Sequence, residues 1–300
     1  GASRWNEPCV PVYTTGTSID TGGQPRESLR TVYGRIDQDI DRAIELLEKA
    51  RETTLAENNK SHINLYVALG IKSRACLAEG DWDGAFKAAK RVIDEGGYAV
   101  GTKSDLTGGM NSLDKQNVMW GAGIQVADQA GGYAGFFTHM DNKEGAYAKS
   151  APKLISKQLY NRISATDIRR DWWDPSDKES PYVSKKFSFA NVASFLGDYI
   201  YMRVEEMYFT AAEAALRLDD LKSARELMNT VMAERDPGYS ANNRSGTLLG
   251  ATTTTWTGSF LENILTHRRI ELWGEYGRLF DVRRLGQGID RRTDDGFSEE

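Results

Sequence analysis

Apolar residues recur at three- and four-residue steps through the first third of the chain, which is the spacing of one face of an α-helix. The first such run follows Pro25 and continues to about Leu47. A second run spans about 62–79 and a third about 83–95, and Gly96 follows the third directly. Because glycine commonly stands just after a helix, the pattern predicts three helices before residue 98.

Two segments far apart in the chain share one pattern, "ACLAEGDWDGAFKAAKRVIDE" and "AALRLDDLKSARELMNTVMAE". Placing Ala85 on Ala224 also aligns Asp81 with Asp220. The small residues allow two helices to approach closely, and the turn before each alanine fixes a hairpin. The pattern resembles the tetratricopeptide helical pair. Generic antiparallel helix hairpins remain the alternative.

The residues between these two segments follow a different pattern of apolar and polar positions. Alternating apolar residues in 117–127 predict a strand, with Trp120 expected in the core, and a glycine-rich stretch follows over 128–142. A short helix is expected over 152–163 and a second strand over 181–190. The sequence therefore predicts helical hairpins that carry a long irregular insertion, and functional residues concentrate on such loops.

Composition excludes several classes of protein. The chain of 300 residues has a formal net charge of −5, which gives no basic excess for binding nucleic acid. No apolar run approaches the roughly 18 residues of a membrane span. With two cysteines and three histidines without ligand spacing, neither a disulfide framework nor a metal site is indicated. We expect no cofactor.

The stretch 267–286, "HRRIELWGEYGRLFDVRRLG", predicts one long helix with an apolar face. Beside that face lies a stripe of alternating positive and negative side chains. Glu271 and Glu275 each have an arginine within reach on that stripe. A neighbouring cation favours the ionised carboxylate, whereas acid–base catalysis needs two carboxylates with separated pKa values. The stripe therefore predicts structural ion pairs. For Gly274 and Gly277 we expect a close approach by another backbone.

The same stretch resembles the C-terminal signature of the SusD/RagB family of glycan-binding outer-membrane lipoproteins. Three further segments match the family in order: 25–47, 80–100 and 201–216. The residues that carry the two most specific matches are Arg203, Glu206, Ala212, Glu213 and Ala214, and then Arg268, Arg269, Glu271, Leu272, Glu275, Arg278, Asp281 and Arg284, with Val282 in place of the usual leucine.

The resemblance implies a mainly α-helical, SusD-like fold in a single domain over 1–300. Its tetratricopeptide-like helices are expected at about 26–97 and 201–236. The loop-rich insertion, with a few short strands, is expected at about 101–200, and the signature helix at about 260–286.

The resemblance also implies a function. Members capture oligosaccharides or polysaccharides at the cell surface and deliver them to a SusC-like TonB-dependent transporter in the outer membrane. The resemblance further implies a surface-exposed protein of the outer membrane, lipid-anchored through a cysteine in the family's N-terminal region, which this sequence does not include.

Two aromatic clusters in the insertion are the candidate binding residues. A sugar ring stacks its C–H face on a flat aromatic, and its hydroxyls need polar partners because burying them unpaired is costly. We expect one of the adjacent tryptophans to face inward, and Tyr133 to be the better surface candidate of its cluster. The candidate residues are Tyr133, Phe136, Phe137, His139, Asn142, Trp172 and Trp173.

Two other functions remain open. The first alternative is a helical-repeat scaffold that binds a peptide or protein, and the family resemblance does not exclude such cargo. A carbohydrate-active hydrolase would need a distinctive carboxylate pair, and no pair stands out. No nucleophile elbow or catalytic cysteine signature is present, so no catalytic residues are predicted.

Overall fold

The structure is a computed structural model that describes residues 4–53, 59–125, 135–244 and 258–288. The chain divides into two compact units, residues 1–56 and residues 57–300. Each unit is described by itself below. The single-domain organisation expected from the sequence stays a prediction.

The N-terminal unit contains one long helix, α1 (Leu29–Thr53). The chain before this helix folds back on itself, so that Pro8 and Ser28 form an antiparallel bridge. The ring of Trp5 packs edge-on against Tyr33, with 5.7 Å between the ring centroids. The helix expected after Pro25 is therefore present, and these contacts fix its first turns.

Two helical hairpins form the frame of the second unit, as the repeated sequence pattern predicts. The first consists of α2 (Leu65–Glu79) and α3 (Trp82–Glu95), and the second of α8 (Val204–Arg217) and α9 (Leu221–Ala233). The two small residues at matching positions, Ala85 and Ala224, are both fully buried.

The two hairpin turns have the same construction. Asp81 caps α3 by accepting from the backbone N–H of Gly84, and Asp220 caps α9 by accepting from Ser223. The residue before each cap adopts left-handed backbone angles, with φ 85° at Gly80 and φ 62° at Asp219. Capping aspartates satisfy free N–H groups of the first turn, so equivalent residues start both second helices.

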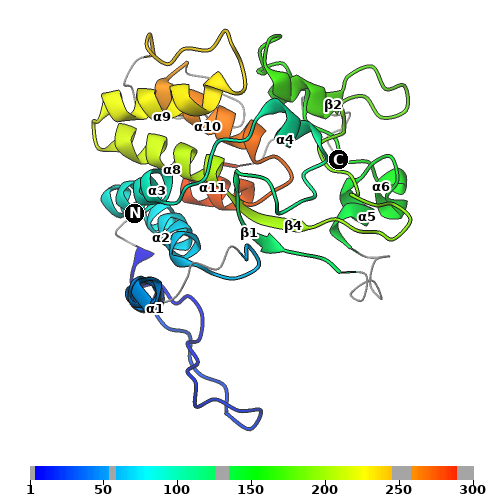
Figure 1. Ribbon diagram of the computed structural model, residues 1–300. Helices are drawn as coiled ribbons and strands as arrows, with labels where there is room; N and C mark the ends of the chain where they lie inside the picture. The colour runs from blue at the N-terminus through cyan, green and yellow to red at the C-terminus, as the bar shows by residue number, and fades with distance from the viewer. Residues whose placement is uncertain (1–3, 54–58, 126–134, 245–257, 289–300) are drawn as a thin grey trace. The chain divides into compact units, whose positions relative to one another are not determined.

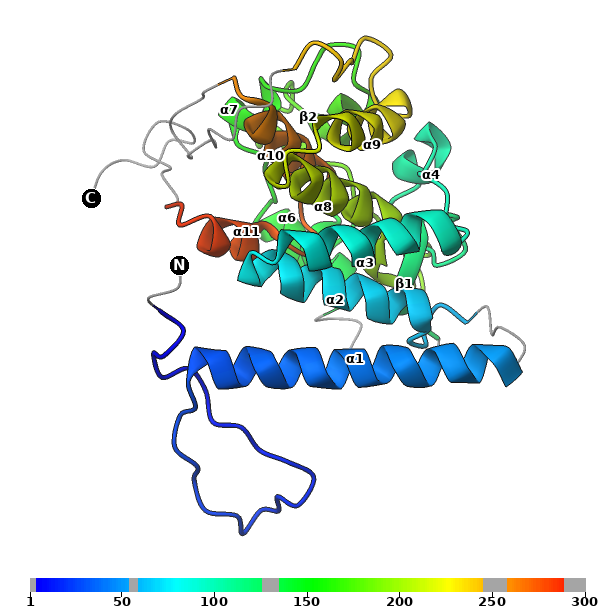
Figure 2. The ribbon, with the colours of Figure 1, turned by 90° about the vertical axis from the view of Figure 1, so that its left-hand side faces the viewer.

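The four helices pack in the order α2, α3, α8, α9, and α10 (Phe260–Glu271) packs on α8 (Figures 1 and 2). Helices α3 and α8 lie side by side although the whole insertion separates them in sequence (Figure 2). The chain thus returns to its first hairpin after the insertion, and the predicted mainly α-helical fold is confirmed.

In its described residues the insertion contains short elements only. Strands β1 (Val118–Ala122) and β4 (Tyr199–Arg203) form an antiparallel pair that aligns Val118 with Arg203, and strands β2 (Trp173–Asp174) and β3 (Val183–Ser184) form a pair that aligns Trp173 with Ser184. Both predicted strands are present but shorter than expected. The elements are α4 (Lys103–Thr107), β1 (Val118–Ala122), α5 (Phe136–Met140), α6 (Ala146–Ser150), α7 (Lys157–Tyr160), the 3-10 helix η3 (Ile168–Trp172), β2 (Trp173–Asp174), β3 (Val183–Ser184) and β4 (Tyr199–Arg203).

The insertion has its own aromatic core, which makes it a packed layer and not a set of free loops. Trp120, which we expected in the core, instead lies half-buried on β1, where its ring meets the edge of Tyr201. The buried members of the core are Leu106, Met110, Phe137, Ile155, Leu159, Tyr160, Ile163, Trp172, Trp173, Phe187, Phe189 and Ile270.

The stretch predicted as one signature helix is two helices, α10 and α11 (Arg278–Arg284). The break follows from Gly274 (φ 75°) and Gly277 (φ 124°), which adopt angles that residues with side chains avoid. A Cβ on Gly274 would lie 2.5 Å from the Phe187 ring, so a side chain, and not the expected backbone, approaches closely. Among the described residues, no helix is both long enough and apolar enough to span a membrane.

Candidate functional site

The paired tryptophans of the insertion are core residues. Trp172 is 2 % exposed and Trp173 is 1 % exposed, so both face inward, where we expected one. The indole N–H of Trp172 donates to the carbonyl of Leu106 at 2.9 Å. Neither ring presents a face at the surface, because the 3-10 helix η3 and the strand β2 turn both side chains into the aromatic core.

The other predicted aromatic cluster, Tyr133, Phe136 and Phe137, does not form one surface in the structure. Phe137 is buried against Phe189 and Tyr199, whereas Phe136 is half-buried at the edge of the core. Tyr133, the residue expected at the surface, lies outside the described residues.

His139 and Asn142 have separate surroundings. His139 is exposed on α5, and its ring stacks on Tyr147 with 4.5 Å between centroids and a 4° interplanar angle. Asn142 donates to the carbonyl of Ser184 at 2.8 Å and accepts from the backbone N–H of Lys153 at 2.8 Å. Both groups of this amide therefore hold loops together.

A pocket of about 270 Å³ opens where β4, the first turn of α5 and the loop between α10 and α11 meet. Of the predicted residues that the structure describes, Phe136 alone lines it. Most of its wall is apolar, which is typical of sites for small ligands. The lining residues are Arg74, Met110, Phe136, Phe187, Tyr199, Ile200, Tyr201, Gly274, Glu275 and Tyr276.

Strand β4 supplies three consecutive residues to this pocket, Tyr199 to Tyr201. Tyr201 is 41 % exposed, so part of its ring is open to solvent. The hydroxyl of Tyr199 accepts from the backbone N–H of Phe136 at 3.2 Å, which joins α5 to the strand. The pocket therefore combines one accessible ring with rings fixed by packing.

Arg74 of α2 forms one charged part of the wall. Its Nε donates to Glu206 Oε1 at 2.9 Å and its Nη2 to Glu206 Oε2 at 2.6 Å, a bidentate ion pair. The same Nη2 donates to the carbonyl of Tyr201 at 2.7 Å. The guanidinium lies 3.8 Å from the ring centroid of Tyr276, which also stacks on Phe280. These contacts hold the arginine in place beside two tyrosines.

Glu275 is the other charged group of the wall. Arg203 donates to both of its oxygens at 2.8 Å, and Lys186 donates to Oε1 at 2.5 Å. Burial alone would raise the pKa of Glu275, but these two cations outweigh burial and hold its pKa below the ordinary value. The carboxylate is therefore ionised and compensated.

Behind the pocket lies a buried cluster of alternating charges, which we call the central charge cluster. Glu271 is its centre and pairs with Arg235 at 2.9 Å, Arg203 at 3.0 Å and Arg169 at 3.2 Å. Burial opposes ionisation of Glu271, yet the three guanidinium groups hold its pKa well below the ordinary value. The cluster consists of Asp167, Arg169, Lys186, Arg203, Glu205, Arg235, Glu271 and Glu275.

The two most specific motifs of the sequence pair with each other. Arg284 of α11 donates to Glu213 of α8 at 2.7 Å and to Asp281 at 2.8 Å. Arg268 of α10 donates to Asp281 at 3.0 Å and lies 3.6 Å from Glu206. The predicted structural ion pairing is thus confirmed. The partners come mainly from α8 and the insertion and not from the same helix, because Arg268 and Glu271 face different elements although both lie on α10.

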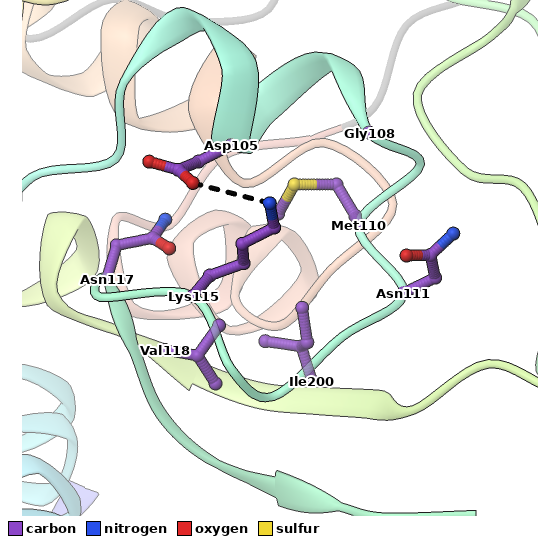
Figure 3. A pocket seen from close by; sticks show the side chains of 8 residues that line it. All are labelled: Asp105, Gly108, Met110, Asn111, Lys115, Asn117, Val118 and Ile200. Carbon is purple, nitrogen blue, oxygen red and sulfur yellow. Dashed lines mark ion pairs between the residues drawn. The ribbon is translucent and has the colours of Figure 1, made fainter. Parts of the chain in front are cut away.

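A second, much smaller cavity is lined by residues around α4 and β1, together with Ile200 of β4 (Figure 3). Its volume of about 10 Å³ has room for about one water molecule. Lys115 and Asp105 form an ion pair across it at 3.4 Å. Met110 and Ile200 line both cavities and so separate them.

The arrangement is suited to binding. Both carboxylates named by the signature, Glu271 and Glu275, have pKa values below the ordinary value, so neither of these two groups is a protonated general acid at neutral pH. Among the described residues, no group of three or more histidine, cysteine, aspartate or glutamate side chains is placed to hold a metal ion.

Sequence reasoning missed most of this pocket. Arg74 lies on a helix assigned to the frame, and Tyr276 was assigned to an apolar helix face. One signal was available in "YIYMR", where Tyr199 and Tyr201 stand two positions apart shortly before the buried Arg203. Alternation of this kind places both rings on one side of a strand.

Comparisons with known proteins agree with this architecture. A structure of a SusD-like carbohydrate binding protein from Bacteroides vulgatus is similar, with a TM-score of 0.77 and 29 % identity over 93 % of this chain and 57 % of its own. A SusD superfamily protein from Bacteroides thetaiotaomicron has a TM-score of 0.74 and 21 % identity over 97 % of this chain and 63 % of its own.

Surface glycan-binding protein A from Bacteroides uniformis has a TM-score of 0.67 and 17 % identity over 96 % of this chain and 65 % of its own. The chain thus spans 57–65 % of the length of these three structures. No curated protein matches the chain in sequence. The sequence model of the SusD family matches residues 137–296, more than half of the chain. The protein belongs to the SusD family.

Proposed function

We propose that this protein binds an oligosaccharide or polysaccharide without cleaving it, and that the pocket beside β4 is its binding site. The single observation that carries the proposal is the aromatic wall of this pocket in a SusD-family chain. The similar structures include proteins described as carbohydrate binding and surface glycan-binding, which supports a glycan as the ligand.

The chemistry of the pocket fits a sugar ring. The open ring of Tyr201 offers an apolar face for the C–H side of a pyranose. Hydroxyls at the ring edge need hydrogen-bond partners. Arg74 offers Nη1, which has no hydrogen-bond partner among the described residues, and Glu275 offers carboxylate oxygens at the wall.

Binding without catalysis follows from the ionisation of the carboxylates. A glycosidase needs one protonated carboxylic acid beside an ionised carboxylate. The cations around Glu275 and Glu271 lower both pKa values, so neither carboxyl group carries a proton at neutral pH. We therefore expect no hydrolysis of a bound glycan.

The proposal extends to the place of action. Membership of the SusD family supports a role at the outer-membrane surface, where the bound glycan passes to a SusC-like TonB-dependent transporter. Co-purification of such a transporter with the full-length protein from its native membrane would test this part separately from glycan binding.

The first experiment is calorimetric titration with a panel of neutral and acidic oligosaccharides and their parent polysaccharides. We expect saturable binding to at least one member. Tyr201→Ala should weaken it about tenfold or more, or about 1.4 kcal/mol, because the accessible stacking ring is lost.

Tyr147→Ala is the matched control, since Tyr147 is similarly exposed at 38 % but lies outside the pocket lining. Equal losses from both variants would contradict the assignment of the site. Release of new reducing ends would favour a hydrolase. If no glycan binds, peptide cargo becomes the leading alternative.

A further inference from the structure

The pocket has two charged residues in its described lining, Arg74 and Glu275, and both are already neutralised from behind. Glu206, which is 2 % exposed, holds Arg74 through two hydrogen bonds. Arg203 and Lys186 hold Glu275. At this described lining, a ligand therefore meets polar groups but no uncompensated charge.

The central charge cluster extends this balance behind the wall. Its four acids, Asp167, Glu205, Glu271 and Glu275, face the four bases Arg169, Lys186, Arg203 and Arg235. The formal charges cancel, so the cluster adds little net potential at the pocket. A carboxylate or sulfate placed there would lose its hydration without gaining a counter-charge, and burying an unpaired charge is far more costly than burying a hydroxyl.

From this balance we infer that the pocket selects uncharged sugar residues and discriminates against uronates and sulfated sugars. This inference rests on the proposed glycan binding and specifies its ligand class. A neutral pyranose can stack on Tyr201 and can hydrogen-bond to Arg74 and Glu275 without breaking either ion pair. An anion would have to compete with Glu206 for Arg74, the one arginine in the described part of the wall.

The test uses two forms of one ligand. The oligosaccharide that binds best in the panel is titrated beside a derivative whose primary hydroxyls are oxidised to carboxylates, at 0.15 M and 0.5 M salt. We expect the dissociation constant of the acidic form to be at least about tenfold higher. The ratio should persist at 0.5 M salt, because long-range repulsion by the net charge of −5 is screened there.

A pair of variants separates the local effect from net charge. Glu206→Gln removes the negative charge that neutralises Arg74. It should therefore reduce the ratio of the dissociation constants of the acidic and neutral ligands at least about threefold. Asp83→Asn removes the same formal charge from an exposed helix position, where the Asp83 side chain is 59 % exposed, and should leave the ratio unchanged. Circular dichroism verifies folding, and if Glu206→Gln does not fold, the wild-type ratio and its salt dependence decide.

Three results would overturn the inference: equal or tighter binding of the acidic form, a ratio that disappears at high salt, or equal effects of Glu206→Gln and Asp83→Asn. In each case the neutral ligand still binds, so the proposed function stands. If no panel member binds, the proposed function fails, and the inference fails with it.

Discussion

At the scale of single residues, His267 shows how burial beside a cation fixes a protonation state. Arg169 Nη2 donates to His267 Nδ1 at 2.8 Å, so this nitrogen must keep its lone pair. Burial, and then the charge of Arg169, hold the pKa of His267 well below its ordinary value of 6.5. The imidazole is therefore neutral in the folded protein at physiological pH.

This neutral histidine predicts a loss of stability in acid. Below pH 6.5 the unfolded chain binds a proton at His267 and the folded chain does not, so the free energy of unfolding falls by up to about 1.4 kcal/mol per pH unit. In His267→Gln the amide oxygen can accept from Arg169 without titrating. Denaturant unfolding of both proteins from pH 7.5 to 5.5 measures the difference. Parallel pH profiles would contradict the prediction.

The candidate binding residues show which side-chain positions can be predicted from the sequence. Of the two adjacent tryptophans we expected one to face inward, but Trp172 ends the 3-10 helix η3 and Trp173 begins strand β2. That change of backbone conformation turns both rings inward, and no hydrophobic periodicity in the sequence indicates it. Tyr201 is the opposite case: it is close in sequence to core residues, yet 41 % exposed.

At the scale of elements, the repeated hairpin was the most predictable part of the fold. Its signals are local: an aspartate that caps the next helix and a small residue four positions later, as with Asp81 and Ala85. The helix break before α11 was missed. The glycines were assigned a packing role, whereas the left-handed backbone at Gly274 and Gly277 ends the helix.

The two hairpin turns predict an order of stability. Gly80→Ala should lower the free energy of unfolding by about 1 kcal/mol, because a Cβ disfavours the left-handed conformation. Gly80→Asp should cost less, since Asp219 occupies the same position in the second hairpin with φ 62°. A new Cβ would make ordinary contacts of 3.5 Å or more with Trp82, so backbone conformation is tested without a clash. An equal cost for both substitutions would contradict the prediction.

At the scale of the whole second unit, the central charge cluster joins the insertion to the helical frame. Arg169 comes from the insertion, Arg203 from β4, Arg235 from the end of α9 and Glu271 from α10. No single stretch of sequence contains these partners. Their pairing was therefore beyond sequence analysis, although the signature that supplies Glu271 was recognisable.

This junction predicts a large and global effect of one substitution. Glu271→Gln should lower the free energy of unfolding by about 3–5 kcal/mol, because it leaves buried guanidinium groups uncompensated. Tryptophan fluorescence, which includes Trp172 and Trp173 of the insertion, and the helical circular-dichroism signal should report the same transition. Asp83→Asn, in an exposed ion pair with Lys87, should cost at most about 1 kcal/mol. Separate transitions for the two signals would contradict the coupling.

Strand β4 passes from the proposed binding pocket to the protein core within five residues. Tyr199 to Tyr201 line the pocket, whereas Met202 and Arg203 are buried. Under the proposed function, a substitution at the exposed Tyr201 changes the recognition surface, while Arg203 keeps its ion pairs with Glu271 and Glu275. Ligand preference and the stability of the frame can therefore change separately, at different positions of one strand.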